Sequence, residues 1–186
     1  MPPKARITKE QILSAAVDLV RKSGADALNA RTLASLLACS TQPIFSNFSS
    51  MEELRLAVVG KADTVCSEYI QREIESGKYP VYKASGMAYI RFAKEERELF
   101  KLLYMRDRAG ETESDQPTKN TQMESVVHRN TGLSDAETKL FHFEMWAFVH
   151  GIAAMFATGF LDLDWDTVSG MLTDAYQGLR KQYGVE

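Results

Sequence analysis

Helical periodicity runs through almost the whole chain, and it constrains the fold more than any other feature of the sequence. Apolar residues such as Ile12, Ala16 and Val20 recur about one helical turn apart, which places them on one face of a helix. No stretch alternates apolar and polar residues for long enough to build a sheet, and no repeat of solenoid length is present. Since 45% of the 186 residues are hydrophobic, the chain can bury a substantial core. The sequence therefore predicts an all-α protein.

Capping residues divide this pattern into separate helices. Thr8, Asn29 and Ser50 each precede a periodic run, where their side chains can accept hydrogen bonds from the first turn, and Gly24 follows the first helix. Further helices are predicted over 30–38, 41–48, 51–76, 82–94, 95–105, 121–130, 134–159 and 166–183. In the helix over 30–38, three leucines are expected to face inward: Leu33, Leu36 and Leu37. The polar segment 106–120 is expected to be a mobile loop.

Charge is distributed unevenly along the chain. The formal net charge is −3, but residues 1–50 carry six Lys and Arg side chains against three acids, which gives +3 there and −6 elsewhere. A basic N-terminal part joined to an acidic remainder is typical of a DNA-binding module attached to a part that does not bind DNA. We therefore expect two domains, a helix-turn-helix DNA-binding domain over 1–50 and a helical ligand-binding and dimerisation domain over 51–186.

Two short predicted helices meet at a tight turn, Cys39-Ser40, and the second of them has the length of a recognition helix in the DNA major groove. Ile44 and Phe48 are expected to anchor it to the core, while Gln42 can form a bidentate pair with adenine. The other residues expected to face bases or nearby phosphates are Thr41, Pro43, Ser46 and Asn47. Lys4, Arg6, Thr8, Lys9, Asn29 and Arg31 are expected to contact phosphates, which supply affinity rather than sequence choice.

The first 55 residues resemble the DNA-binding domain of the TetR (tetracycline repressor-like) family. The resemblance is carried by ILSAAVDLV followed by Gly24, by ARTLASLLA, by the Cys39-Ser40 turn and by TQPIFSNF. The sequence departs from the family pattern at Ala38, where Gly is usual, and at Met51, where Lys is usual. Phe45 holds the place of an aromatic residue that often reaches a phosphate in the family, but it has no hydroxyl group.

This resemblance implies a cytoplasmic transcriptional regulator, by family default a repressor, that binds a pseudo-palindromic operator in double-stranded DNA as a homodimer. The segment WAFVHGIAAM, from Trp146 to Met155, is similar to a Trp-x-x-x-His-Gly signature in the C-terminal domain of one TetR subgroup. By the same resemblance, the last two long helices would pair with their mates in a second subunit as a four-helix bundle. Small residues in this region, including Gly151 and Ala154, would allow close approach of these helices.

A small, largely apolar effector is also implied, and the C-terminal part is rich in aromatic and Met side chains that can line its cavity. The candidates are Tyr69, Tyr89, Phe92, Phe100, Tyr104, Phe141, Met145, Trp146 and His150. Any single one of them is more simply an ordinary core residue, although the resemblance implies a ligand site somewhere in this part of the chain. His150 can offer a polar group to a ligand or be a hydrogen-bonded histidine of the core.

Other classes of protein find little support. No nucleophile elbow, phosphate-binding loop, dinucleotide fingerprint or HExxH motif is present, so we expect no enzyme. His128, His142 and His150 are too few and too poorly spaced for a metal site, and no cofactor is expected. Two cysteines without a paired framework fit a reducing compartment, and no uninterrupted apolar run suggests a membrane span or a signal sequence. A TetR-like binder that has lost its DNA function remains an alternative, which the basic N-terminal half disfavours.

Overall fold

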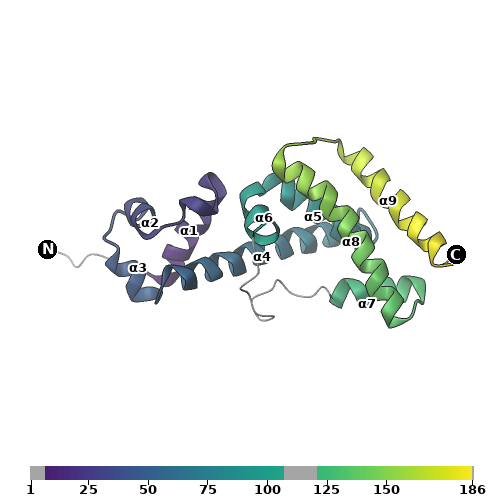
Figure 1. Cartoon of the computed structure of the whole chain (residues 1–186), viewed down its shortest axis with the longest axis horizontal. Helices are drawn as coiled ribbons and strands as arrows, with labels where there is room; N and C mark the ends of the chain where they lie inside the picture. The colour runs from purple at the N-terminus through teal and green to yellow at the C-terminus, as the bar shows by residue number, and fades with distance from the viewer. Residues whose placement is uncertain (1–6, 107–120, 186) are drawn as a thin grey trace. The chain divides into compact units, whose positions relative to one another are not determined.

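The computed structural model describes residues 7–106 and 121–185, and this part of the chain contains helices and no β-strand (Figure 1). The predicted all-α class is therefore confirmed. The expected loop over 106–120 falls, from residue 107 onward, outside the described residues.

The helices follow the predicted order, and their ends differ from the predicted ends by only one or two residues. They are α1 (Lys9–Ser23), η1 (Ala25–Ala27), α2 (Ala30–Leu36), α3 (Gln42–Asn47), α4 (Met51–Glu75), α5 (Val81–Glu95), α6 (Arg97–Tyr104), α7 (Thr121–Thr131), α8 (Asp135–Thr158) and α9 (Trp165–Gln182).

Side-chain caps begin several of these helices at the predicted residues. Thr8 and Ser134 form capping boxes with the third residues of α1 and α8. The Asn29 side chain accepts a hydrogen bond from the Thr32 amide at 3.0 Å, and Ser50 accepts one from the Glu53 amide at 3.1 Å. Each cap satisfies an amide that the helix itself leaves without a partner, so these short polar signals define where the helices start.

The chain divides into two compact units. The first contains Met1–Val65 and Glu98–Pro117, and the second contains Cys66–Arg97 and Thr118–Glu186. Helix α4 belongs to both, because it begins in the first unit and ends in the second.

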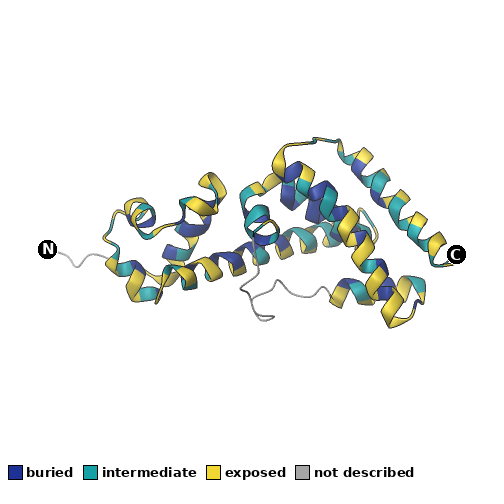
Figure 2. Cartoon of the chain, viewed as in Figure 1, coloured by how far each residue is buried: buried dark blue, intermediate teal, exposed yellow. Residues whose placement is uncertain are grey.

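In the first unit, α1 packs against η1, α2 and α3 around a small core. Ile12, Ala16 and Val20 of α1 are buried, as predicted, together with the recognition-helix residues Ile44 and Phe48 (Figure 2).

The prediction for Leu36 was wrong, since this side chain is 59% exposed, and Leu37 is only half-buried. The buried face of α2 is formed by Leu33 and its neighbour Ala34. The inward stripe of α2 runs through Ala30, Leu33, Ala34 and Leu37, and Leu36 lies about 110° around the helix from the middle of this stripe.

The turn between α2 and α3 places an alanine in a left-handed backbone conformation. Ala38 has φ of 49°, and it is the only residue other than glycine with a positive φ in the described part of the chain. The Cys39 amide donates to the Ala34 carbonyl at 3.0 Å and the Ala38 amide to the Ser35 carbonyl at 3.1 Å. This pair of bonds is the Schellman motif, which usually places glycine at the left-handed position.

In the second unit, α5 packs most extensively against α8, and both also contact α7 and α9. Small residues permit this close packing. A Cβ atom added to Gly86 of α5 would lie 3.0 Å from Leu172 Cδ2 of α9. Among the described residues, one helix, α8, is long and apolar enough to cross a membrane. This is weak evidence for a membrane span, because the core helix of a soluble protein can have the same length and composition.

Candidate functional sites

The exposed face of α3 is the candidate DNA-reading surface. Gln42 and Ser46 are exposed, and Phe45 is 48% exposed, whereas Ile44 between them is fully buried. Pro43 is half-buried in the first turn, and Thr41 is half-buried just before the helix. The short helix therefore presents one face to solvent, while Ile44 and the C-cap residue Phe48 hold its other face to the core.

Two polar residues of α3 already have partners within the protein. The Ser46 hydroxyl donates to the Gln42 carbonyl at 2.9 Å. The Asn47 side-chain amide donates to the Pro43 carbonyl at 2.8 Å and to the Ile7 carbonyl at 3.4 Å. Asn47 thus ties α3 to the residues that precede α1, and of the predicted base-reading side chains Gln42 is the exposed one with the donor and acceptor pair that adenine requires.

The residues predicted to contact phosphates lie in different settings. Thr8 and Asn29 are exposed but cap α1 and α2 with their side-chain oxygens. Arg31 is exposed in the first turn of α2. Lys4 and Arg6 lie outside the described residues.

Lys9 forms an ion pair with Glu53 at 2.9 Å and lies 4.6 Å from the centre of the Phe48 ring. Glu53 also accepts hydrogen bonds from the Ser49 amide at 2.6 Å and from the Ser49 hydroxyl at 2.8 Å. The hydrogen bond from Lys9 and those from Ser49 lower the pKa of Glu53 to about 2. Glu53 is therefore charged at neutral pH in the first turn of α4, where the helix dipole favours an anion, and it offsets one cation of the basic N-terminal part.

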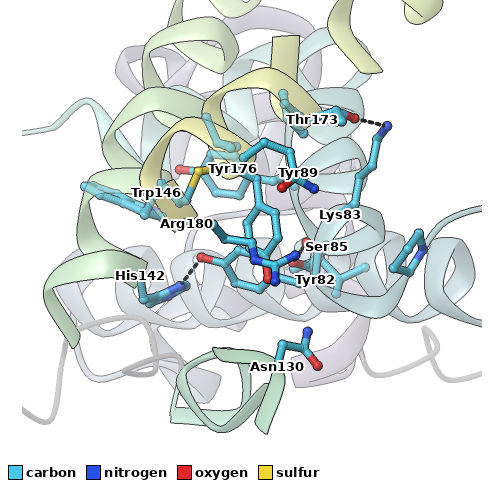
Figure 3. Close-up of a pocket in the computed structure, with 17 residues that line it drawn as sticks. Tyr82, Lys83, Ser85, Tyr89, Asn130, His142, Trp146, Thr173, Tyr176 and Arg180 are labelled. Atoms are coloured by element: carbon cyan, nitrogen blue, oxygen red, sulfur yellow. Dashed lines mark hydrogen bonds between the residues drawn. The ribbon is translucent and has the colours of Figure 1, made fainter. Parts of the chain in front are cut away.

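A cavity of about 530 Å³ lies within the second unit (Figure 3). Three helices supply most of its wall, each through side chains that recur at one-turn spacing, so that each helix presents one stripe to the same space. The stripes are Tyr82, Lys83, Ser85, Gly86 and Tyr89 of α5, His142, Met145, Trp146 and Val149 of α8, and Leu172, Thr173, Tyr176, Gln177 and Arg180 of α9. Ile70, Pro80 and Asn130 complete the lining.

Two tyrosine–histidine pairs join α5 to α8 beside the cavity. The Tyr82 hydroxyl lies 2.9 Å from Nδ1 of His142, and the Tyr89 hydroxyl lies 2.9 Å from Nδ1 of His150. Burial raises the pKa of both tyrosines and lowers the pKa of both histidines. All four side chains are therefore neutral at pH 7, and they offer hydrogen bonds rather than charge.

Of the residues predicted to bind a ligand, Tyr89, Met145 and Trp146 line the cavity. His150 lies behind them, bonded to Tyr89 and stacked on Trp146 with ring centres 4.9 Å apart. The remaining predicted residues are not part of the lining. Phe141 packs against Tyr176, Tyr69 packs against Phe92, and Phe100 packs against Tyr104 in the first unit.

Sequence reasoning missed most of the polar lining, including Tyr82, Tyr176 and Arg180. The signal was present in α5, where Tyr82 and Tyr89 lie two turns apart with Ser85 and Gly86 between them. Tyrosines and small residues that share one face of a buried helix indicate a wall of a cavity more than aromatic content alone does. Within the described residues, no group of three or more His, Cys, Asp or Glu side chains could hold a metal ion.

Comparison with known proteins identifies the family. A family described as the tetracyclin repressor-like C-terminal domain matches residues 82–175, half of the chain. The chain belongs to the TetR family. This TetR-family protein is therefore a transcriptional regulator, and the family assignment implies a DNA-binding regulator rather than an enzyme. The Trp-x-x-x-His-Gly subgroup stays a prediction.

Solved structures share the fold of this TetR-family chain. A protein of unknown function from Rhodococcus sp. RHA1 is 22% identical, with a TM-score of 0.75, over 96% of this chain and 98% of that one. A protein assigned to the TetR family of transcriptional regulators from Vibrio parahaemolyticus is 19% identical, with a TM-score of 0.64, over 91% and 96%. A TetR-family member from Streptomyces coelicolor A3 is 15% identical, with a TM-score of 0.61, over 89% and 96%. No curated protein matches the sequence.

Proposed function

We propose that this TetR-family regulator is a repressor. It dissociates from its operator when a small molecule binds in the cavity of the second unit. The observation that carries the proposal is that one chain combines an exposed recognition-helix face on α3 with a cavity lined by α5, α8 and α9. Cavities of several hundred cubic ångströms with mainly apolar walls and a few polar groups are typical of small-molecule sites.

DNA recognition is assigned to residues 1–50, and effector binding and dimerisation to 51–186. Gln42 reads a base, and Arg31, Lys4 and Arg6 contact phosphates. Thr41, Pro43, Phe45 and Ser46 lie at or near the exposed face of α3 and complete the contact. The side chains of Thr8 and Asn29 cap helices, and the Asn47 side chain donates to a backbone carbonyl. These three residues contact DNA only through polar atoms that are not used in those hydrogen bonds.

The protein acts as a homodimer because α8 carries an apolar face that nothing covers within the described part of a single chain. Leu140 and Phe143 are 51% and 60% exposed, and Phe148 and Met155 continue the same face. Gly151 lies on this face, with no atom within 4 Å of the position of an added Cβ. Large exposed apolar patches mark interaction sites, and a second copy gives the twofold symmetry that a pseudo-palindromic operator requires.

Helix α4 couples effector binding to DNA binding, because it belongs to both units. A ligand that binds one conformation of the second unit better than another shifts the population of that conformation, and α4 transmits the shift to the unit that contains α3. The ligand can shift the equilibrium only by its difference in affinity for the two states. The protein acts in the cytoplasm, where its operator lies.

Recovery of the DNA bound by the protein across the genome of its source organism tests this proposal. The recovered sites should share a pseudo-palindromic sequence, and purified protein should bind one of them in a gel shift much more tightly than scrambled DNA of the same length. Deleting the gene should raise transcription beside those sites. Equal affinity for recovered and scrambled DNA would contradict the DNA-binding role, and lower transcription in the deletion strain would show an activator.

A further inference from the structure

The wall of the cavity in the second unit is positively charged. Lys83 of α5 and Arg180 of α9 line it, and none of the 17 lining residues is an aspartate or a glutamate. The other titratable lining groups are His142, which is neutral at pH 7 because burial lowers its pKa, and tyrosines. Glu124 of α7 acts electrostatically on His142, but it is not part of the lining.

Lys83 has only neutral partners among its observed contacts. Its ammonium group donates to the Thr173 hydroxyl at 2.7 Å and lies 5.1 Å from the centre of the Tyr79 ring. None of the ion pairs in the described part of the chain includes Lys83. An ammonium group has three donors and a full charge, so a hydroxyl group and a ring face leave it able to bind an anion.

Arg180 approaches the cavity from α9 and in Figure 3 reaches into the space beside Tyr82 and Ser85. A guanidinium group presents a planar fork that matches the two oxygens of a carboxylate. If Nδ1 of His142 carries the ring proton, His142 donates to the Tyr82 oxygen, and the Tyr82 hydroxyl can then donate to a bound anion.

The rest of the wall is mainly apolar or aromatic, and it also contains four uncharged polar side chains: Ser85, Asn130, Thr173 and Gln177. Ile70, Met145, Trp146, Val149 and Leu172 form surfaces that suit hydrocarbon or a ring rather than a sugar or a polar peptide. This lining suits a ligand that combines an apolar body with negative charge.

We propose that this cavity takes an organic acid, with an aromatic or aliphatic body against the apolar wall and a carboxylate held by Lys83 and Arg180. The inference rests on the proposed effector function, and it specifies the chemical class of the effector. The sequence predicts a largely apolar effector. The two cationic side chains in the lining instead favour a ligand that also carries a negative charge.

Matched probes test the inference on the full-length protein. Phenylbutanoate and phenyloctanoate are each compared with their uncharged primary amides, which keep the size and shape of the acid. Binding is measured by calorimetry and by tryptophan fluorescence, to which both Trp146, which lines the cavity, and Trp165, which does not, contribute. A charge-assisted contact should make the better acid bind about ten-fold or more tightly than its amide, and the difference should shrink as salt is added.

Two substitutions locate the charge effect. Lys83→Met and Arg180→Met keep an apolar stem of similar length, and the preference for acid over amide should fall in at least one of them. Lys78→Met is the matched control, because Lys78 lies at the same 5.1 Å from the Tyr79 ring but does not line the cavity. This control should keep the preference of the unsubstituted protein.

Amides that bind as tightly as the acids, or a preference that survives in both cavity variants, would overturn the inference. Lack of binding by every acid and amide would overturn it as well. The proposed function is tested separately. If an amide binds in the cavity and causes the protein to dissociate from operator DNA, the effector function stands although the acid preference fails. If an acid binds in the cavity without any effect on DNA binding, the acid site is supported and the effector function is contradicted.

Discussion

Ala38 holds a left-handed conformation at the turn between α2 and α3, with φ of 49°. For an L-residue with a Cβ atom this conformation costs about 1–2 kcal/mol. The same Schellman arrangement at the end of α8 uses a glycine, Gly159, with φ of 71°. The sequence flagged Ala38 as a departure from the family pattern, and the structure shows that the alanine adopts the conformation rather than avoiding it.

We predict that Ala38→Gly stabilises the protein. The substitution should raise the free energy of unfolding by about 1 kcal/mol, because the relief of backbone strain exceeds the extra conformational entropy of glycine in the unfolded chain. Urea unfolding followed by circular dichroism measures the change. Ala57→Gly, inside α4, is the control and should destabilise by up to about 1 kcal/mol. A loss of stability in both variants would contradict the strain argument.

Gln42 and Arg31 should differ in what their loss does to DNA binding. Gln42→Ala should cost about 1–3 kcal/mol on the best operator and relax the preference at one base pair if Gln42 reads a base edge, as we propose. Arg31→Ala should weaken binding to all sequences alike and reduce the salt dependence if Arg31 contacts phosphate, as we propose. Fluorescence anisotropy against operators with single base-pair changes measures both effects. Unchanged affinity and base preference in Gln42→Ala would mean that α3 meets DNA through other residues.

At the scale of elements, Glu53 connects the start of α4 to α1 and to the end of the recognition helix. It accepts hydrogen bonds from Lys9 and from both the amide and the hydroxyl of Ser49. These bonds fix the direction in which α4 leaves the helix-turn-helix. The segment from Ser49 to Glu53 thus positions both α3 and α4, the helix that belongs to both units.

We predict that the contribution of Glu53 to stability depends on pH. Its pKa falls from 4.5 to about 2 on folding, so the native state favours the charged form, and this stabilisation is present above pH 4.5 and lost as the pH falls toward 2. Glu53→Gln should therefore lower the melting temperature near neutral pH, and the difference from the unsubstituted protein should close between these two values. Thermal unfolding across this pH range measures it.

The control for this experiment is Glu52→Gln in the same helical turn. Glu52 is exposed and pairs only weakly, at 3.6 Å, with Arg55, and exposed pairs of this kind contribute little. The Glu52→Gln variant should follow the unsubstituted protein at every pH. If Glu53→Gln behaves in the same way, the bonds to Lys9 and Ser49 do not stabilise the native state.

At the scale of the whole molecule, the apolar face of α8 allows a sharp test of dimerisation. Gly151→Leu adds a large side chain where a single chain has no atom within 4 Å of the added Cβ, so the subunit should still fold. If a second copy packs on this face, the added side chain should shift the mass in light scattering from two chains toward one at micromolar concentration. Gly60→Leu is the matched control on α4, where the surroundings are equally open, and it should leave the dimer intact. A Gly151→Leu variant that remains fully dimeric would place the interface elsewhere.

Coupling between effector and operator must also be reciprocal. A coupling free energy of about 1–3 kcal/mol would lower operator affinity roughly 5- to 150-fold when the effector is bound. The same factor must then lower effector affinity when the operator is saturating. Calorimetric titration of the best cavity ligand with and without operator measures it. Equal ligand affinity in both titrations would show that the cavity binds without signalling to α3.

Local signals in the sequence determined the helices, their ends and the helix-turn-helix. Periodicity and caps act within one or two turns, so Thr8, Asn29 and Ser50 mark helix starts whatever the rest of the chain does. The tertiary structure alone decided which side chains share a space. Tyr82, Tyr176 and Arg180 meet around one cavity because of how α5, α8 and α9 pack, whereas Phe100 and Tyr104 lie in the other unit. Packing between helices that are distant in sequence depends on the shape of whole faces, and a list of aromatic residues does not contain that information.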